Sequence, residues 1–247
     1  MKLLSKDKFT TLPSAVLIDL DNTLYAYDAA HEAGIKAVAK KAQEDFDLKG
    51  KRFSELFLEA RTKVKARLKD NTSARNRLLY FQELLEIIGL GSAVKSALEY
   101  EQTYWIKFLQ AMELFIGVND FFDDLRLRGI PTVLVTNLNT KIQLQKLVFL
   151  GLEESFSSVV TSEQAGAEKP SSAIFNLAAD RLKLEKRDMW MIGDDLNADM
   201  QGAKKVLNCT TILKTNGNRY SRKSLEAVDA YFDEFSNITN LIDNLGR

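Results

Sequence analysis

Short runs of consecutive apolar residues are the first pattern in the chain. The run AVLI at 15–18 ends on the polar sequence DLDNT at 19–23. Four similar runs follow in the second half of the chain: IPTVLVT at 130–136, SSVVT at 157–161, MWMIGDD at 189–195 and CTTILK at 209–214. Because they are continuously apolar instead of alternating, these runs favour strands of a parallel sheet that is covered on both faces.

Helical patterns separate the later apolar runs. They predict helices over 119–127, 139–150, 171–182 and 198–206. Strands that alternate with helices in this way indicate βαβ units and a doubly wound, Rossmann-like parallel sheet. The fold class is therefore α/β.

The stretch between the first two strands has a different texture. It contains no proline from residue 27 to 112, and apolar residues recur at helical spacing. The pattern predicts helices over 28–46, 52–69, 73–88 and 92–112, with Ser73 and Ser92 as N-caps of the last two. Four amphipathic helices of this length can bury one another's apolar faces. We therefore expect a core domain of residues 1–24 and 116–247, with an inserted helical bundle at 25–115.

Composition excludes several classes of protein. The 247 residues contain 34 basic and 34 acidic side chains, so no overall charge favours nucleic acid or an anionic membrane. About 18 consecutive uncharged apolar residues would indicate a membrane span, and no such run occurs. Cys209 is the only cysteine, which rules out an internal disulfide and favours a reducing compartment. We expect a cytoplasmic protein, with Cys209 as a small buried residue.

Polar side chains follow most of the predicted strands. In a doubly wound sheet, ligands bind beyond the carboxyl ends of the strands. The side chains at these ends are Asp19, Asp21, Asn22 and Thr23, then Thr136 and Asn137, then Lys169, and finally Asp194, Asp195 and Asp199. The sequence therefore predicts one common site.

The residue types at these ends indicate phosphoryl transfer. Converging carboxylates need a cation, and hard oxygen ligands suit Mg²⁺. A lysine and a threonine hydroxyl suit the oxygens of a transferring phosphoryl group. Asp19 can then attack phosphorus, while Asp21 can protonate the leaving oxygen and later deprotonate water.

Four motifs, in order along the chain, resemble the haloacid dehalogenase (HAD) superfamily of phosphohydrolases. They are DLDNT at 19–23, VTN at 135–137, Lys169 with Pro170, and GDDLNAD at 193–199. The helical insertion after the first motif is similar to a cap of the family's first cap class. Relatives often have a proline before the glycine of LFIGV, where this chain has Ile116.

The resemblance implies a role for each matching residue. It implies that Asp19 is the nucleophile and that Asp21 is the acid/base residue, whose backbone carbonyl also ligates Mg²⁺. It implies phosphate binding by Thr136, with Asn137 beside it, and by Lys169. Asp194 matches the acidic metal ligand and Asp199 its more distant acidic partner, whereas Asp195 either contacts the metal through water or is solvated.

The leading hypothesis is a Mg²⁺-dependent phosphatase of a small phosphorylated metabolite, with sugar phosphates and nucleoside monophosphates favoured. A phosphomutase on the same scaffold is the alternative enzyme, and a receiver-like phospho-accepting module is the alternative from another class. Receivers lack an insertion of this size. Hydrolytic dehalogenation is disfavoured because those relatives lack the second aspartate, which is Asp21 here.

Three features outside the motifs have competing interpretations. His31, the only histidine, is expected on a helix surface, which leaves no histidine cluster for a metal. Arg75 and Arg77 are expected to be solvated, with binding of a distal anionic group of the substrate as the alternative. Tyr100, Tyr104, Trp105 and Phe108 form an aromatic stripe, for which packing is expected.

Overall fold

The computed structural model describes residues 1–69, 71–182 and 188–246. Its internal contacts divide the chain into two compact units. We call the first, Met1–Ala26 with Glu113–Arg247, the sheet unit, and the second, Tyr27–Met112, the helical unit. No helix in the described part of the chain is long and apolar enough to cross a lipid bilayer.

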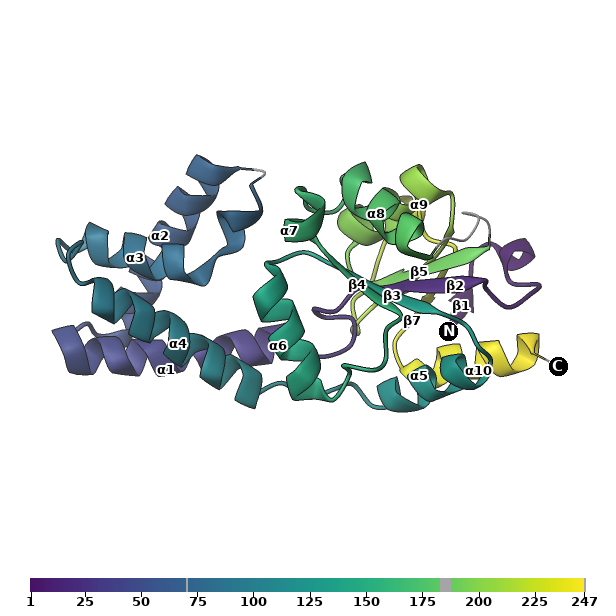
Figure 1. Cartoon of the computed structure of the whole chain (residues 1–247), viewed down its shortest axis with the longest axis horizontal. Helices are drawn as coiled ribbons and strands as arrows, with labels where there is room; N and C mark the ends of the chain where they lie inside the picture. Colours follow the sequence, from purple (N-terminus) through teal and green to yellow (C-terminus); the bar gives the residue numbers. More distant parts are fainter. Residues whose placement is uncertain (70, 183–187, 247) are drawn as a thin grey trace. The chain divides into compact units, whose positions relative to one another are not determined.

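The sheet unit is built on a mostly parallel sheet (Figure 1). The described residues form seven strands in the order β1-β7-β6-β5-β2-β3-β4. The strands are β1 Lys2–Leu3, β2 Ala15–Ile18, β3 Thr132–Thr136, β4 Ser158–Thr161, β5 Met189–Gly193, β6 Thr210–Lys214 and β7 Ala230–Phe232. Only the β1–β7 pair is antiparallel among them. The predicted doubly wound α/β class is confirmed.

The central strands β2, β3 and β5 are buried along their whole length because helices cover both faces of the sheet. In Figure 1, α8 and α9 lie on one side of the sheet, and α5 and α10 lie on the other. The described α-helices of this unit are α5 Val118–Leu127, α6 Thr140–Leu150, α7 Ser162–Ala165, α8 Ser172–Leu182, α9 Gly202–Leu207 and α10 Phe235–Leu245, and two 3-10 helices are η1 Lys6–Lys8 and η4 Lys223–Leu225. A π-helix, η3 Leu196–Gln201, precedes α9 where the sequence predicted the start of an ordinary helix.

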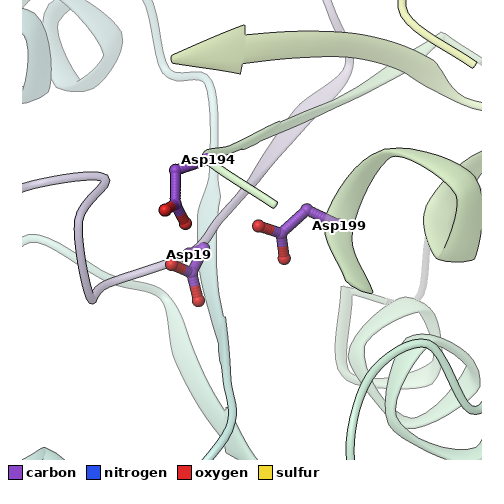
Figure 2. A group of neighbouring side chains, drawn as sticks. All are labelled: Asp19, Asp194 and Asp199. Atoms are coloured by element: carbon purple, nitrogen blue, oxygen red, sulfur yellow. The ribbon is translucent and has the colours of Figure 1, made fainter. Parts of the chain in front are cut away.

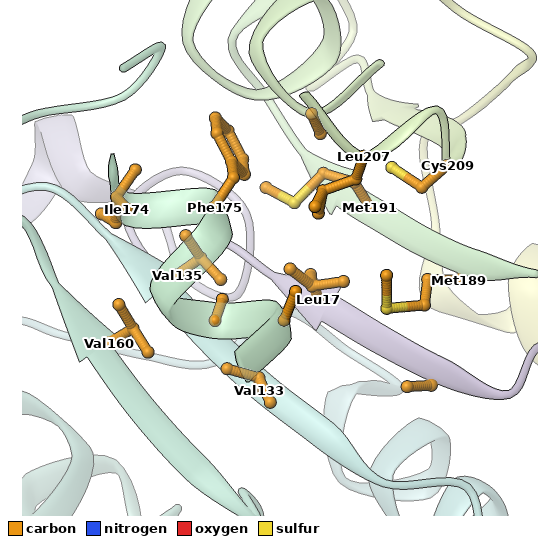
Figure 3. Packing of buried hydrophobic residues seen from close by; sticks show 14 of the residues in the cluster. Leu17, Val133, Val135, Val160, Ile174, Phe175, Met189, Met191, Leu207 and Cys209 are labelled. Carbon is orange, nitrogen blue, oxygen red and sulfur yellow. The ribbon is translucent and has the colours of Figure 1, made fainter. Parts of the chain in front are cut away.

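One hydrophobic core lies beneath α8 and α9 (Figure 3). Leu17, Val135 and Met191 of neighbouring strands meet Phe175 of α8 there. Complete burial of one Leu, Val, Met or Phe side chain stabilises a fold by ~1.5–3 kcal/mol. Cys209 belongs to the same cluster and is 1% exposed, which confirms that it is a small buried residue.

The helical unit consists of amphipathic helices and one short 3-10 helix. They are α1 Tyr27–Phe46, α2 Gly50–Leu68, η2 Thr72–Arg75, α3 Arg77–Ile87 and α4 Val94–Gln110. Aromatic side chains fill its interior: the predicted stripe on α4 is buried, and Phe81 lies edge-on to Tyr100 at a centroid distance of 6.1 Å. The stripe is therefore a packing feature.

The predicted N-caps of the helical unit are wrong. The sequence predicted a single helix over 73–88, but η2 and α3 are separate and begin after Asn71 and Asn76, whose side chains accept backbone N–H groups. Ser73 lies inside η2. Helix α4 begins after Ala93 rather than Ser92. Asn competes well with Ser at caps, so residue type alone did not locate these starts.

Candidate active site

The polar side chains at the strand ends do converge. Strand β2 pairs in parallel with both β3 and β5, with Ile18 opposite Leu134 on one side and Ile192 on the other. Asp19 follows β2 and Asp194 follows β5. Because parallel neighbours end at the same edge, the sheet brings residues about 175 positions apart in the sequence to one site.

Three carboxylates form the centre of this site. Figure 2 shows Asp19, Asp194 and Asp199 directed toward one another, and each offers one ligand oxygen within 4.8 Å of the others. Asp199 is 1% exposed and Asp19 is 6% exposed. Side chains of this type and spacing can hold a divalent cation through oxygen ligands.

Lys169 contacts this cluster through its ammonium group. Its Nζ lies 2.5 Å from Asp19 Oδ1, 2.7 Å from Asp199 Oδ1 and 2.7 Å from the Val135 carbonyl oxygen, to each of which it donates. Thr23 donates its hydroxyl to Asp19 Oδ2 at 3.1 Å. Both oxygens of Asp19 are therefore held, which fixes the orientation of its carboxylate.

The electrostatics of the cluster favour binding of a further cation. Burial raises the pKa of Asp19 to about 7; Lys169 opposes the increase, and Asp199 and Asp21 add to it. Burial, with the charges of Asp19 and Asp199, raises the pKa of Asp194 to about 8. One ammonium group does not balance three neighbouring carboxylates, and a divalent cation would offset the remaining repulsion.

The loop after β5 is shaped around Asp199. A Cβ atom at Gly193 would lie 2.3 Å from Asp199 Oδ2, so the close approach requires glycine there. The backbone N–H of Asp195 donates to the same oxygen at 3.1 Å. Asp195 itself is exposed, and its Oδ1 accepts the N–H groups of Asn197 and Ala198 at 2.8 Å. The structure therefore gives Asp195 a capping role at the start of η3.

The predicted phosphate-binding residues lie beside the cluster. Asn137 holds the backbone of Lys169, since its Oδ1 accepts the Lys169 N–H at 2.8 Å and its Nδ2 donates to the Lys169 carbonyl at 3.4 Å. Thr136 is fully buried, and its hydroxyl accepts from Nε2 of Gln143. An accepting hydroxyl keeps its own hydrogen to donate. Their phosphate-binding role stays a prediction.

Comparison with known proteins identifies the family. The family described as hydrolase, haloacid dehalogenase-like hydrolase, matches residues 13–206. The chain belongs to this hydrolase family. The match includes every strand-end residue described above, so the predicted resemblance is confirmed.

Relatives of this hydrolase include phosphatases. It is 37% identical to the ribulose-1,5-bisphosphate 5-phosphatase of Halopiger xanaduensis over 196 residues. The aligned residues make up 79% of this chain and 82% of the relative. It is 30% identical to the glyceraldehyde 3-phosphate phosphatase of Methanopyrus kandleri, over 78% of this chain and 80% of the relative. The chain is a phosphatase of the HAD-like family.

A solved structure shares the fold. The magnesium-bound putative HAD-hydrolase YfnB of Bacillus subtilis aligns with a TM-score of 0.71 and 18% identity, covering 94% of this chain and 100% of that chain. This likeness concerns the fold, in which a Rossmann-like sheet is accompanied by helices.

Sequence reasoning missed the residues that hold Asp21. Lys146 of α6 is fully buried, and its Nζ lies 2.6 Å from Asp21 Oδ1. The Tyr25 hydroxyl donates to the same oxygen. Tyr25 follows Asp21 by four positions, just as Thr23 follows Asp19, so the motif carried a weak local signal. Nothing in the sequence pointed to Lys146, which is 125 positions from its partner.

Two expectations about the helical unit are wrong. Arg77 was expected to be solvated but is 7% exposed, whereas its neighbour Arg75 is exposed as expected. His31 was expected on a helix surface, but it is half-buried and shares a 2.7 Å hydrogen bond with the Tyr104 hydroxyl. In both cases tertiary packing, rather than residue type, set the burial.

Proposed function

We propose that this hydrolase removes phosphate from a small phosphorylated metabolite through an aspartyl-phosphate intermediate on Asp19. The observation that carries the proposal is the double anchorage of the Asp19 carboxylate by Lys169 and Thr23 at the carboxyl end of β2. Relatives are named for ribulose 1,5-bisphosphate, glyceraldehyde 3-phosphate and N-acylneuraminate 9-phosphate. Phosphorylated sugars and related sugar acids are accordingly the substrate class we favour, followed by nucleoside monophosphates.

We propose Mg²⁺ as the cofactor. The donor set fits it, because the ligand oxygens of three carboxylates lie within 4.8 Å of one another and are only partly balanced by Lys169. The carboxylates of Asp19 and Asp194, with the backbone carbonyl of Asp21, would hold the ion. When bound, Mg²⁺ neutralises charge on the phosphoryl oxygens.

The first chemical step is attack of a carboxylate oxygen of Asp19 on phosphorus. An O–P bond forms to Asp19 as the bond from phosphorus to the leaving oxygen breaks, and Asp21 supplies the proton that the leaving alcohol needs. Lys169 and the Thr136 hydroxyl stabilise the charge of the phosphoryl group. Lys146 and Tyr25 hold the Asp21 carboxyl in one place through its Oδ1.

The second step is hydrolysis of the intermediate. Asp21, now ionised, takes a proton from water as the water oxygen attacks phosphorus, and the bond from phosphorus to Asp19 breaks. Inorganic phosphate leaves, and the Asp19 carboxylate is restored. The two ammonium groups differ in role, because Lys169 contacts the nucleophile and Lys146 contacts the acid/base residue.

We also propose that the helical unit selects the leaving group. It supplies a large insertion, Tyr27–Met112, directly after the nucleophile loop. The phosphomutase hypothesis uses the same groups but transfers the phosphoryl group back to a sugar phosphate. Isomer interconversion of a hexose 1-phosphate without phosphate release would favour it over hydrolysis.

The test is phosphate release from a panel of phosphorylated metabolites, with Mg²⁺ and with EDTA. We expect turnover on a sugar phosphate that requires Mg²⁺, and none for Asp19→Asn. Asp180→Asn, the same change at an exposed position of α8, is the matched control and should retain full activity. Appreciable turnover by Asp19→Asn would refute the role of the nucleophile.

A trapping experiment tests the intermediate. Acid quench of Asp21→Asn with substrate should show phosphate bound covalently to the protein, because the base for the second step is missing. Wild-type enzyme should show less of this adduct at steady state. An Asp21→Asn variant that turns over at the wild-type rate would contradict the acid/base assignment.

A further inference from the structure

The helical unit holds a buried arginine. Arg77 is the first residue of α3 and is 7% exposed. Its Nη2 donates to the Tyr27 hydroxyl, and its Nη1 donates to the Arg75 carbonyl oxygen at 2.6 Å. Its Nε is buried and has no hydrogen-bond partner. A guanidinium group has five N–H donors, so this one retains unused capacity.

Aromatic rings, not acids, surround this guanidinium. Its central carbon lies 5.4 Å from the ring centroid of Tyr104, 5.5 Å from Tyr80 and 5.7 Å from Trp105. Within the described ranges, no Asp or Glu carboxylate lies at ion-pair distance from Arg77. Ring faces attract a cation, but they do not neutralise its charge. Buried charges are normally paired, so the lack of an anionic partner for Arg77 among the described residues is the unusual feature here.

The polar side chains His31 and Tyr104 near Arg77 supply no negative charge to balance it. His31 stacks on Tyr27 at a centroid distance of 5.6 Å and shares its Nδ1 hydrogen bond with Tyr104. Burial, with the positive charges of Arg77 and Arg61, lowers the pKa of His31 to about 4. His31 is therefore neutral at pH 7 and adds no further positive charge. Tyr27 and His31 are themselves half-buried.

We propose that the cluster of Tyr27, His31, Arg77 and Tyr104 binds a small oxyanion, either a phosphate or a carboxylate group. Such an anion would accept a hydrogen bond from the unpartnered Nε of Arg77. The oxyanion could come from either of two sources. One is a second anionic group on the substrate, a possibility that rests on the proposed function. The other is a free anion that regulates the enzyme.

His31 makes binding directly observable. It is the only histidine, so untagged protein gives a single imidazole Cε1–H resonance. The pKa of His31 is measured by NMR in two solutions of matched ionic strength, one of sodium sulfate and one of sodium chloride. Both solutions contain EDTA. Sulfate placed beside Arg77 should raise the pKa of His31 by at least about one unit relative to chloride, because it offsets the positive charge. Equal titrations in the two salts would overturn the proposal.

Variants connect the response to Arg77. In Arg77→Met the pKa of His31 should already be raised without sulfate, and sulfate should have no further effect. Arg75→Met, which removes an exposed arginine two residues away, should respond as wild type does. If Arg77→Met does not fold by circular dichroism, Arg77→Lys serves instead, since it keeps the charge but loses the planar fork and should bind sulfate more weakly. A sulfate response in Arg77→Lys equal to wild type would also overturn the proposal.

Kinetics separate the two sources. If the anion belongs to the substrate, Arg77→Met should raise KM about tenfold or more for a sugar bisphosphate, while KM for p-nitrophenyl phosphate stays unchanged. If the anion is free, sulfate should change p-nitrophenyl phosphate hydrolysis in wild type but not in Arg77→Met. The anion site would be refuted if Arg77→Met changed neither KM nor the sulfate effect and if sulfate did not shift the pKa of His31. Absence of any phosphatase turnover would instead refute the proposed function and leave the NMR result standing.

Discussion

The nucleophile should destabilise the folded enzyme at alkaline pH. The pKa of Asp19 is about 7 in the folded chain, and its ordinary value is 3.8. Between these two values the folded state binds the proton more tightly than the unfolded state does, so the free energy of unfolding falls as pH rises. Above about pH 8 the carboxyl is ionised in both states, and the full cost is present. Asn has similar volume and does not ionise, so Asp19→Asn should remove this cost.

The size of the effect follows from the two pKa values. They differ by about 3, and each pKa unit corresponds to ~1.4 kcal/mol, which sets an upper limit of ~4 kcal/mol. Relaxation around Lys169 reduces the gain, so we expect Asp19→Asn to be more stable than wild type by about 2–4 kcal/mol at pH 8 in EDTA. At pH 4 the difference should be close to zero. An inactive variant would then be the more stable one.

Urea denaturation in EDTA, at constant ionic strength and several pH values between 4 and 8, measures this difference. Unfolding is followed by far-UV circular dichroism and by tryptophan fluorescence, because the two units need not unfold together. The exposed control Asp180→Asn should differ from wild type by a small amount that does not depend on pH. An Asp19→Asn variant less stable than wild type at pH 8, or equally displaced at every pH, would refute the reasoning.

Three further predictions concern the same site. Lys146→Met should lower kcat by about 10–100-fold, because the Asp21 carboxyl loses its buried cation. Lys141→Met, on the exposed face of the same helix, should leave kcat unchanged. Equal rates for the two variants would contradict the role of Lys146. Gly193→Ala should abolish phosphate release, since its Cβ would lie 2.3 Å from Asp199, and Gly50→Ala, which meets no atom within 4 Å, should be silent in the same assay. Mg²⁺ at 100 times its Kd should stabilise the enzyme against urea by ~2.7 kcal/mol at pH 8. The stabilisation should be smaller at pH 5, because the Asp19 and Asp194 carboxyls, with pKa values of about 7 and 8, are protonated there. Equal stabilisation at the two pH values would argue against these ligands.

Local sequence was sufficient for the central sheet. Strands covered on both faces are mostly apolar without strict alternation, so AVLI and the later runs identified β2 to β6 without any knowledge of contacts. The short outer strands β1 and β7 were missed because they have two and three residues, too few for a pattern. Helix α10 was also not predicted, although its apolar face packs on α5 through Phe235 and Phe121 at a centroid distance of 5.4 Å.

The sequence by itself determined which residues lie at the carboxyl ends of the strands. Neighbouring parallel strands end at the same edge of a sheet, irrespective of the conformation of the loops. That rule placed Asp19 and Asp194 at one site, and the order of the four motifs identified the family. Only the tertiary structure decided the burial of the charged residues beyond the motifs. Lys146 meets Asp21, and Arg77 enters an aromatic cluster, through contacts between residues far apart in the chain. Burial of a charge depends on the groups that surround it, and a helical pattern of lysines and arginines is the same whether a given one faces water or the interior.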